Sequence, residues 1–423
     1  MTTTINNEQK KLNVPNLRFP EFQGEWEELG LSELLDFKNG LNPKLDKFGK
    51  GIKFISVMDI LNNAVITYDC IKASVDVTEK ELSDFSVEKG DILFQRSSET
   101  LEDVGRANVY MDDKTAVFGG FVIRGKKKGE YDPQYFNYLL RSPFARKRIV
   151  PMGAGAQHFN IGQEGLSKVN LHFANIKEQK KIGKMFSLLD ERIATQNKII
   201  EDLKKLKCAI IDEVFCSPKQ REPNRRFEGC SEPLSTYKMK DFCFRITDKN
   251  KDNKCSLVLT IAAQYGLVDQ ESFFNKSVAS ENLTGYYILN KGDFAYNRSY
   301  SSGYAWGAVK RLNNYSEGVL STLYICFRAD ESIVDSDYLS YYFESSKWHK
   351  EVSDISGEGA RNHGLLNISV SDYFNTEHRF ATMSEQKRIA SMLNAIVIKE
   401  QNAIELGKLY SKQKQYLLRQ MFI

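Results

Sequence analysis

The chain has 423 residues, more than one domain usually holds, and its hydrophobic content of 41% is enough for real cores. Its net charge of +4 excludes a wholesale polycation, so any contact with nucleic acid must come from local basic clusters. The seven cysteines are scattered without a CxxC pair, and no HExxH accompanies the five histidines, which argues against a structural zinc site.

The termini and the apolar runs bear on the compartment. The polar stretch 1–13 carries no signal h-region, and no apolar run is long enough to span a bilayer. An odd number of cysteines without a disulfide framework is typical of reduced thiols. We therefore expect a cytoplasmic protein that makes no use of a membrane.

Short β-rich runs come first along the chain, separated by turn signals such as Lys-Gly-Asp. Strands are predicted at Lys53–Met58, Asp91–Gln95 and Ala116–Ile123, because these runs are rich in β-branched and aromatic residues. A helical pattern follows at Pro133–Ile149. Helices and strands do not alternate strictly, so the pattern favours an α+β fold over a doubly wound sheet.

A long helix is predicted next, at Glu178–Phe215, a stretch without proline. At 1.5 Å per residue this helix is about 57 Å long. Its apolar residues recur at a spacing of three and four, which places them in one stripe that needs a partner. The stripe comprises Ile182, Met185, Phe186, Leu189, Ile193, Ile200, Leu203, Leu206, Ile210 and Val214.

The chain then repeats itself after a polar linker, Cys216–Glu222. Pro223–Phe227 echoes Pro15–Phe19, and a Lys-Gly-Asp turn followed by Arg-Ser occurs in both halves. Further strands are predicted at Gly292–Asn297 and Thr322–Arg328, with a helix at Ser336–Glu351.

A second long helix is predicted at Glu385–Phe422. It aligns with Glu178–Phe215 without a gap, and both copies open with Glu-Gln-Lys and close on Phe. We expect the two stripes to pair with each other in an antiparallel coiled coil; the alternative is two unrelated helices, each docked on its own core. The second stripe comprises Ile389, Met392, Leu393, Ile396, Ala403, Leu406, Tyr410, Leu417 and Met421.

The repeat predicts a pseudo-twofold tandem duplication, with units at about 15–215 and 223–422. Each unit has a globular part followed by a long helix. The boundaries we expect are a first globular domain at 1–175, a first spacer helix at 176–215, a second globular domain at 216–383 and a second spacer helix at 384–423.

Over nearly its whole length the chain resembles the DNA-specificity subunit of type I restriction–modification systems. The resemblance rests on the two Glu-Gln-Lys helices, the opening PNLRFPEFQGEWEE, and the Lys-Gly-Asp…Arg-Ser and Gly-x-Gly-Ala loops of both halves. It implies two target-recognition domains separated by the paired helices. It also implies double-stranded DNA as a partner, with two methyltransferase subunits for adenine-N6 methylation and two motor–nuclease subunits.

Catalytic motifs were sought across the whole sequence. It holds no GxxxxGK[ST] phosphate loop, no Asp/Asn-Pro-Pro-aromatic methylation motif, and no GxGxxG between a strand and a helix. The family resemblance therefore implies that this chain is not an enzyme and carries no cofactor. S-adenosylmethionine would belong to the methyltransferase partner, and ATP and magnesium to the motor–nuclease partner.

Two kinds of loop are candidates for DNA contact in both halves. Arg-Ser follows equivalent strands, and Gly-rich loops at Gly153–Asn160 and Gly357–His363 allow close backbone approach. The alternatives are an Arg-Ser loop that bonds its own backbone and a Gly-rich turn packed on the long helix. The candidate residues are Arg96, Ser97, Ser98, Gln157, His158, Asn160, Arg298, Ser299, Tyr300, Arg361, Asn362 and His363.

Basic side chains form further sets, although a solvated surface explains any single run and is favoured for Lys126–Lys128. The stretch Leu101–Met111 has no clear counterpart in Ser301–Lys310, which predicts an asymmetric, bipartite target if these stretches face DNA. The other basic sets are Arg141, Arg146, Lys147 and Arg148 in the first half, and Arg245, Lys249, Lys251, Lys254, Arg298 and Arg361 in the second.

Three functions remain open at this point. The first is a non-catalytic subunit that reads a bipartite DNA target for its partners. The second is a coiled-coil adaptor that organises partner subunits without reading sequence. The third is a stand-alone nuclease with an unrecognised site, which would cut DNA as the purified chain.

Overall fold

The structure is a computed structural model that describes residues 13–275, 282–300, 303–356 and 366–423. The chain divides into two compact units. The first contains residues 1–197 and 404–423, and the second contains residues 198–403. Both units mix helices with largely antiparallel sheets, which is the α and β mixture predicted from the sequence.

The first unit contains two four-stranded sheets and two strand pairs. The sheets have the orders β2-β10-β6-β8 and β4-β3-β9-β5, and the pairs are β1-β12 and β7-β11. The strands are β1 (Glu27–Gly30), β2 (Leu35–Asn39), β3 (Phe48–Ile55), β4 (Ser74–Val75), β5 (Ser86–Val87), β6 (Ile92–Gln95), β7 (Ser97–Ser98), β8 (Ala107–Val109), β9 (Ala116–Phe118), β10 (Val122–Lys127), β11 (Phe159–Asn160) and β12 (Asn170–Phe173).

Short helices connect these strands. The α-helices are α1 (Leu31–Leu34), α2 (Val57–Asn62), α3 (Glu79–Phe85), α4 (Pro133–Arg141), α5 (Pro143–Ile149) and α6 (Gln163–Ser167). The 3₁₀ turns are η1 (Leu45–Lys47), η2 (Tyr68–Cys70), η3 (Leu101–Asp103) and η4 (Val150–Met152).

The second unit repeats part of this pairing scheme. Its described sheets have the order β14-β21-β18-β19 and the pairs β13-β22, β15-β16 and β17-β20. The strands are β13 (Ser235–Lys238), β14 (Cys243–Arg245), β15 (Leu259–Ala262), β16 (Gly266–Asp269), β17 (Tyr287–Asn290), β18 (Phe294–Asn297), β19 (Ala308–Arg311), β20 (Glu317–Leu320), β21 (Ile325–Ala329) and β22 (Glu377–Phe380). The short helices are α8 (Met239–Phe242), α9 (Gln270–Phe274), α10 (Ser336–Glu344), α11 (His349–Ile355) and α12 (Val370–Phe374).

The predicted helix at Pro133–Ile149 is in fact two helices, α4 and α5. Pro143 cannot continue a helix and disfavours the helical conformation of the residue before it. Ser142 is accordingly extended, and its side chain accepts a hydrogen bond from the amide of Ala145 to cap α5. The predicted helix at Ser336–Glu351 likewise breaks into α10 and α11, at the extended residue Ser345.

The predicted strands also have different bounds, most clearly at Lys53–Met58 and Ala116–Ile123. The run Lys53–Met58 ends its strand at Ile55, because Ser56 caps α2 and its hydroxyl donates to Asp59 over 2.7 Å. The run Ala116–Ile123 is two strands, β9 and β10, joined by a turn at 119–121. The turn passes close to Phe54, since a Cβ on Gly119 would lie 2.6 Å from that ring.

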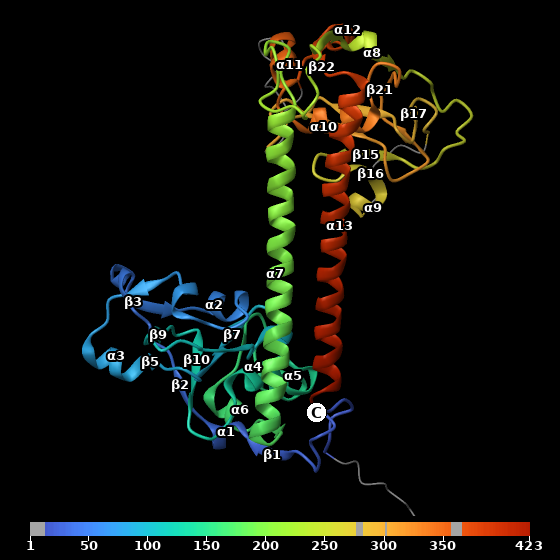
Figure 1. The fold of residues 1–423 in the computed structure, drawn as a ribbon. Coiled ribbons are helices and arrows are strands. Elements are labelled where there is room, and N and C mark those ends of the chain that lie inside the picture. The colour runs from blue at the N-terminus through green and yellow to red at the C-terminus, as the bar shows by residue number, and fades with distance from the viewer. Residues whose placement is uncertain (1–12, 276–281, 301–302, 357–365) are drawn as a thin grey trace, which may run out of the picture. The chain divides into compact units, whose positions relative to one another are not determined.

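The two long helices are α7 (Ile176–Val214) and α13 (Met383–Gln420), drawn in green and red in Figure 1. Each contributes to both units. In the first unit, Phe186 of α7 stacks on Phe422, which follows α13, with 5.8 Å between ring centroids. In the second unit, Ile211 of α7 and Leu393 of α13 lie in one core. Most residues of the apolar stripe predicted for the first long helix are at least partly buried in α7, although Leu206 is 47% exposed.

The Glu-Gln-Lys motif attaches the start of each long helix to its unit. Glu178 is fully buried and accepts two hydrogen bonds from Arg18, of 2.8 and 2.7 Å. In the second unit Glu385 accepts two from Arg226, of 3.1 and 2.6 Å. A buried carboxylate needs such a partner, so the PNLRF and PNRRF echoes supply the arginine that each motif requires.

The glutamine of the motif ties the long helix to the short helix beside it. The side-chain oxygen of Gln179 accepts from the backbone amide of Asp132, which caps α4, over 2.9 Å. Gln386 accepts in the same way from Asp335, the cap of α10, over 2.8 Å. The motif is therefore a structural joint, and the two units build it alike.

Candidate nucleic-acid interface

In the first unit the two candidate loops meet. Strand β7 pairs with β11 in antiparallel register, with Ser98 opposite Phe159 and Ser97 opposite Asn160. The hydroxyl of Ser97 donates to the side-chain oxygen of Asn160. The backbone of Asn160 also exchanges two hydrogen bonds of 2.9 Å with Ala154. The Arg-Ser loop and the Gly-rich loop thus form one surface, which we call the β7–β11 tip (residues 96–98 and 153–160).

Glycine is needed at one position of this tip. Gly155 has a φ of +150°, and a Cβ there would lie 2.0 Å from the carbonyl oxygen of His158. The tight turn leaves Gln157, His158 and Asn160 exposed, whereas Ser97 and Ser98 are half-buried. The loop pairs with β7, and its exposed side chains are polar groups of the kind that can meet base edges.

The two candidate arginines are directed at the protein. Arg96 donates from its guanidinium to the carbonyl of Gly120, over 3.3 Å. Arg298 donates to the carbonyls of Ile368 and Leu323, over 3.0 and 2.9 Å. Gly120 lies in the turn between β9 and β10, and Leu323 lies between β20 and β21, which are the equivalent strands of the second unit. Of the two roles that the sequence left open, these bonds favour the structural one, in which the arginine holds the loop.

The second unit is described in part at the equivalent place. Ser299 and Tyr300 are exposed, the latter by 51%. The backbone amide of Leu366 donates to the carbonyl of Arg298, and in the first unit Ile161 donates to Arg96, both over 2.9 Å. The candidates Arg361, Asn362 and His363 lie outside the described residues.

Two of the other basic candidates, and the aromatic side chain of Tyr296 near the second loop, have structural partners. Lys126 pairs with Glu88 at 3.5 Å and Lys128 with Asp36 at 3.4 Å, both at exposed positions. Tyr296 is buried and stacks on Tyr373 with 4.6 Å between ring centroids. The two ion pairs agree with the solvated surface favoured for Lys126–Lys128 from the sequence.

The structure brings together four basic side chains whose convergence was not predicted from the sequence. A cleft of about 690 Å³ in the first unit is lined by four cationic side chains and one carboxylate, that of Glu102. We call it the basic cleft; its cations are Arg106, Arg141, Arg146 and Lys147. The sequence singled out the last three as a basic set and the stretch that contains Arg106 as unmatched. Nothing in the spacing of these residues indicated that they converge.

Metal ligands and membrane-spanning helices are two further features on which the described residues bear. Within the described ranges, no group of three or more His, Cys, Asp or Glu side chains is placed to hold a metal ion. Among the helices of the same ranges, none combines the length and the apolar character that a bilayer crossing requires.

Comparison with known proteins gives matches at the levels of family, sequence and fold. Residues 23–205 match the model of the type I restriction modification DNA specificity domain. A relative in Methanocaldococcus jannaschii, the putative type I restriction enzyme MjaX specificity subunit, is 26% identical over 211 residues, 49% of each chain. That match therefore spans about half the length of the curated relative.

Solved structures extend the likeness to the whole fold. The S subunit of a type I restriction-modification system from M. genitalium superposes with a TM-score of 0.54 at 13% identity, over 97% of this chain and 99% of that one. A chain from a study of complex assembly and conformational transition in the type I R-M system gives 0.55 at 12% identity, over 93% and 96%. The resemblance inferred from the sequence is thereby confirmed by the match of residues 23–205 to the model of the type I restriction modification DNA specificity domain.

Proposed function

We propose that this chain is the specificity subunit of a type I restriction–modification complex and recognises a bipartite, asymmetric DNA target. Each unit would read one half-site. The chain itself would be non-catalytic and would direct adenine-N6 methylation and restriction by its partners. Those partners are two methyltransferase subunits, which use S-adenosylmethionine, and two motor–nuclease subunits, which use ATP and magnesium.

The observation that carries this proposal is the β7–β11 tip. Polar side chains of Gln157, His158 and Asn160 are exposed there on a turn whose backbone is fixed by pairing with β7. A rigid support with exposed amide and imidazole groups suits the reading of base edges, because such contacts depend on fixed geometry. Arg96 and Arg298 would act as positioning residues for these loops.

The long helices would form an antiparallel coiled coil between two copies of one recognition domain. This part of the proposal is supported inside each unit. The start of α7 packs with the end of α13 in the first unit, and the end of α7 with the start of α13 in the second. The equivalent arginine joints at Glu178 and Glu385 support the duplication.

The proposal is tested by expressing the chain with its methyltransferase partner and mapping N6-methyladenine across the host DNA. We expect methylation at one asymmetric site composed of two different short motifs with an unread spacer. Methylation without a sequence preference would favour the adaptor function instead. Metal-dependent cleavage by the purified chain alone would favour the nuclease.

A further inference from the structure

The basic cleft lies directly beside the β7–β11 tip along the chain. Its wall at Glu102 belongs to η3, which begins three residues after β7 ends, and its wall at Val150 belongs to η4, which leads into the Gly-rich loop. A Cβ on Gly153, where that loop begins, would lie 2.5 Å from Val104, so the two walls are in close contact. The basic cleft and the β7–β11 tip are therefore neighbours in the first unit.

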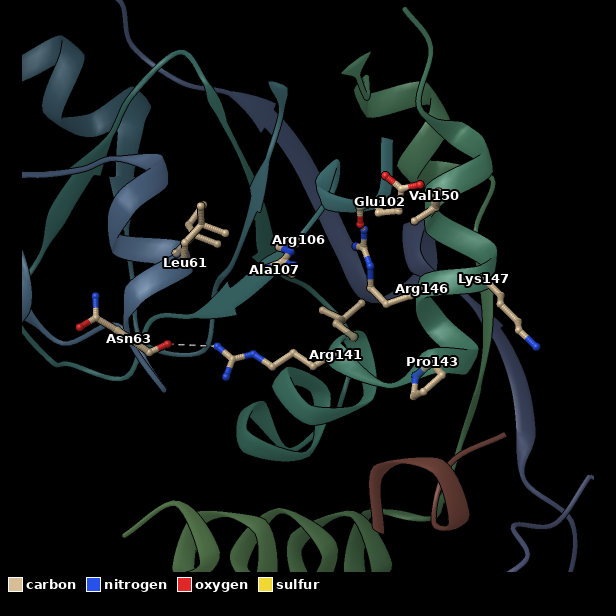
Figure 2. A pocket seen from close by; sticks show the side chains of 12 residues that line it. Leu61, Asn63, Glu102, Arg106, Ala107, Arg141, Pro143, Arg146, Lys147 and Val150 are labelled. Atoms are coloured by element: carbon tan, nitrogen blue, oxygen red, sulfur yellow. Dashed lines mark hydrogen bonds between the residues drawn. The ribbon is translucent and has the colours of Figure 1, made fainter. Parts of the chain in front are cut away.

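Two arginines of the basic cleft are held in place by hydrogen bonds to backbone carbonyls. Arg141 donates to the carbonyl of Asn63 over 3.3 Å, and Arg146 donates from Nη2 to Glu102 and Val104 over 2.9 and 2.6 Å. Figure 2 shows both guanidinium groups in the space between the segment that carries Leu61 and Asn63 and the wall at Glu102, whereas Lys147 points away. The second terminal nitrogen of Arg146, Nη1, is buried and has no hydrogen-bond partner among the residues that the structure describes.

Positive charge is concentrated here with little compensation. Burial, and then the nearby charge of Arg106, lower the pKa of Arg146 to about 10, so it remains charged at neutral pH. Arg106 pairs with Asp103 at 2.5 Å, and this carboxylate also acts on Arg146. The carboxylate nearest to Arg141 on α7, Asp190, already binds Lys414 and the hydroxyl of Tyr138. Arginines gathered at such a cost are typical of a site for an oxyanion, because the guanidinium fork matches phosphate oxygens.

The second unit has different residues at the positions equivalent to the three arginines of the basic cleft. Counted from the caps Asp132 and Asp335, Glu344 replaces Arg141 and His349 replaces Arg146. The strand register places Ala308 where the first unit has Arg106. Lys350 keeps the place of Lys147 and pairs with Asp354. Glu344 pairs with Lys207 at 3.1 Å, and burial lowers the pKa of His349, so the three arginines of the basic cleft have no arginine counterpart there.

We propose that the basic cleft binds a phosphate group of the DNA backbone beside the half-site read by the first unit, and that the second unit makes no equivalent contact. This inference rests on the function proposed above. The contact would fix register without reading sequence, which is the usual role of a phosphate contact.

The experiment uses the full chain in complex with its methyltransferase partner and compares Arg106→Gln with the wild type. Arg106 is suited to substitution because it is exposed and its side chain makes one ion pair. Losing one phosphate contact should reduce the slope of log affinity against log salt by about 0.9, which makes the affinity loss between 50 and 200 mM salt about 3.5-fold smaller. The methylated sequence should stay the same. Lys126→Gln removes one exposed charge from β10 as the matched control and should leave the slope unchanged.

A second arm needs no variant. Neutral methylphosphonate groups are placed one at a time along the DNA, and the wild-type complex should lose affinity at one position flanking the first half-site, with no such position flanking the second. Arg106→Gln should no longer respond at that position. A wild-type complex indifferent to every substitution there would overturn the inference, as would a variant that responds like the wild type.

A free anion or an acidic protein surface bound in the basic cleft would give different results. If inorganic phosphate at millimolar concentration protects the wild type but not Arg106→Gln against thermal unfolding, while both keep the same salt slope on DNA, the cleft binds a free anion and the inference is wrong. It is equally wrong if the variant loses its methyltransferase partner, which would indicate an acidic protein surface. Failure of the proposed function is separate, since the wild-type complex would then show no preference for its target over unrelated DNA.

Discussion

The two units are alike where the long helices join them and unlike where the first unit carries its basic cleft. Arg18 and Arg226 bind their glutamates in the same way, whereas Arg141 has an acidic counterpart, Glu344. The likeness concerns groups that are buried and must be paired, so a change in one would leave a charge without compensation. The difference concerns half-buried and exposed groups, which can change without harm to the fold. One framework thus supports two different surfaces.

The largest effect is expected from breaking the shared joint. Arg18→Ala and Arg226→Ala each leave a buried glutamate without its partner, and each should lower the free energy of unfolding by about 3 kcal/mol. Urea unfolding of the two variants measures this loss. Lys89→Ala, which removes an exposed pair with Asp113, serves as the control and should behave as the wild type. A large loss in only one unit would show that the two joints are not equivalent.

Acid should destabilise the second unit more than the first, and the expected difference in free energy is somewhat smaller than the loss in the arginine variants. Complete burial lowers the pKa of His378 to about 3, against about 6.5 for an unfolded histidine. The stability that this neutral histidine contributes is present above pH 6.5 and is lost as the pH falls toward 3, by about 2 kcal/mol at pH 5. In the first unit His172 lies in the strand pair β1-β12, and burial lowers its pKa by less than it lowers the pKa of His378.

Hydrogen exchange read by mass spectrometry and corrected for intrinsic rates can follow each unit at pH 7 and pH 5. We expect the amides of the second unit to lose more protection than those of the first. His378→Gln should remove most of the difference, because a glutamine does not titrate in this range. Equal losses in both units would contradict this account of His378.

The smallest effect concerns the loop arginines. Arg298→Ala removes two hydrogen bonds to backbone carbonyls and should loosen the loop, which weakens binding of the second half-site by about tenfold, or 1.4 kcal/mol. Because Arg298 acts on the protein, we expect an unchanged salt slope and no new base preference in a binding assay with variant half-sites. A relaxed preference at one base would identify a direct contact with guanine, and a slope reduced by about 0.9 a contact with phosphate.

The sequence predicted the framework better than the surface. The gapless Glu-Gln-Lys repeat and the PNLRF echo were visible because they recur, although their bond could not be seen from the letters. Helix boundaries at Ser142 and Ser56 had local signals, a following proline and a capping serine, which the longer periodic patterns obscured. The direction of the Arg96 side chain had no such signal, since the carbonyl that it binds belongs to a turn 24 residues away.

The basic cleft shows the same limit more clearly. Arg106 and Arg146 are brought together by β8 and α5, elements that are distant in sequence. An alignment of the two halves places a glutamate of the second unit opposite Arg141 in sequence. This difference in residue type is the one signal available without a structure. Convergence of like charges cannot be predicted from periodicity, because it depends on tertiary packing.

The central claim, that one module is used twice, is tested most directly with a fragment of residues 1–219 and the methyltransferase partner. In the full chain Phe422 packs on Trp26, Tyr135 and Phe186 of the first unit, with 5.6 Å between the centroids of its ring and that of Tyr135. Phe215 aligns with Phe422 and packs on the equivalent Tyr338 at 4.9 Å. A second copy of the fragment can therefore supply the missing aromatic group through its own Phe215, in a twofold dimer.

The measurement is the mass of this complex in solution together with a map of its methylated adenines. The account predicts a dimer of the fragment that methylates a palindrome built from the first half-site twice. A folded monomer, or a dimer that still methylates the asymmetric site of the full chain, would contradict it.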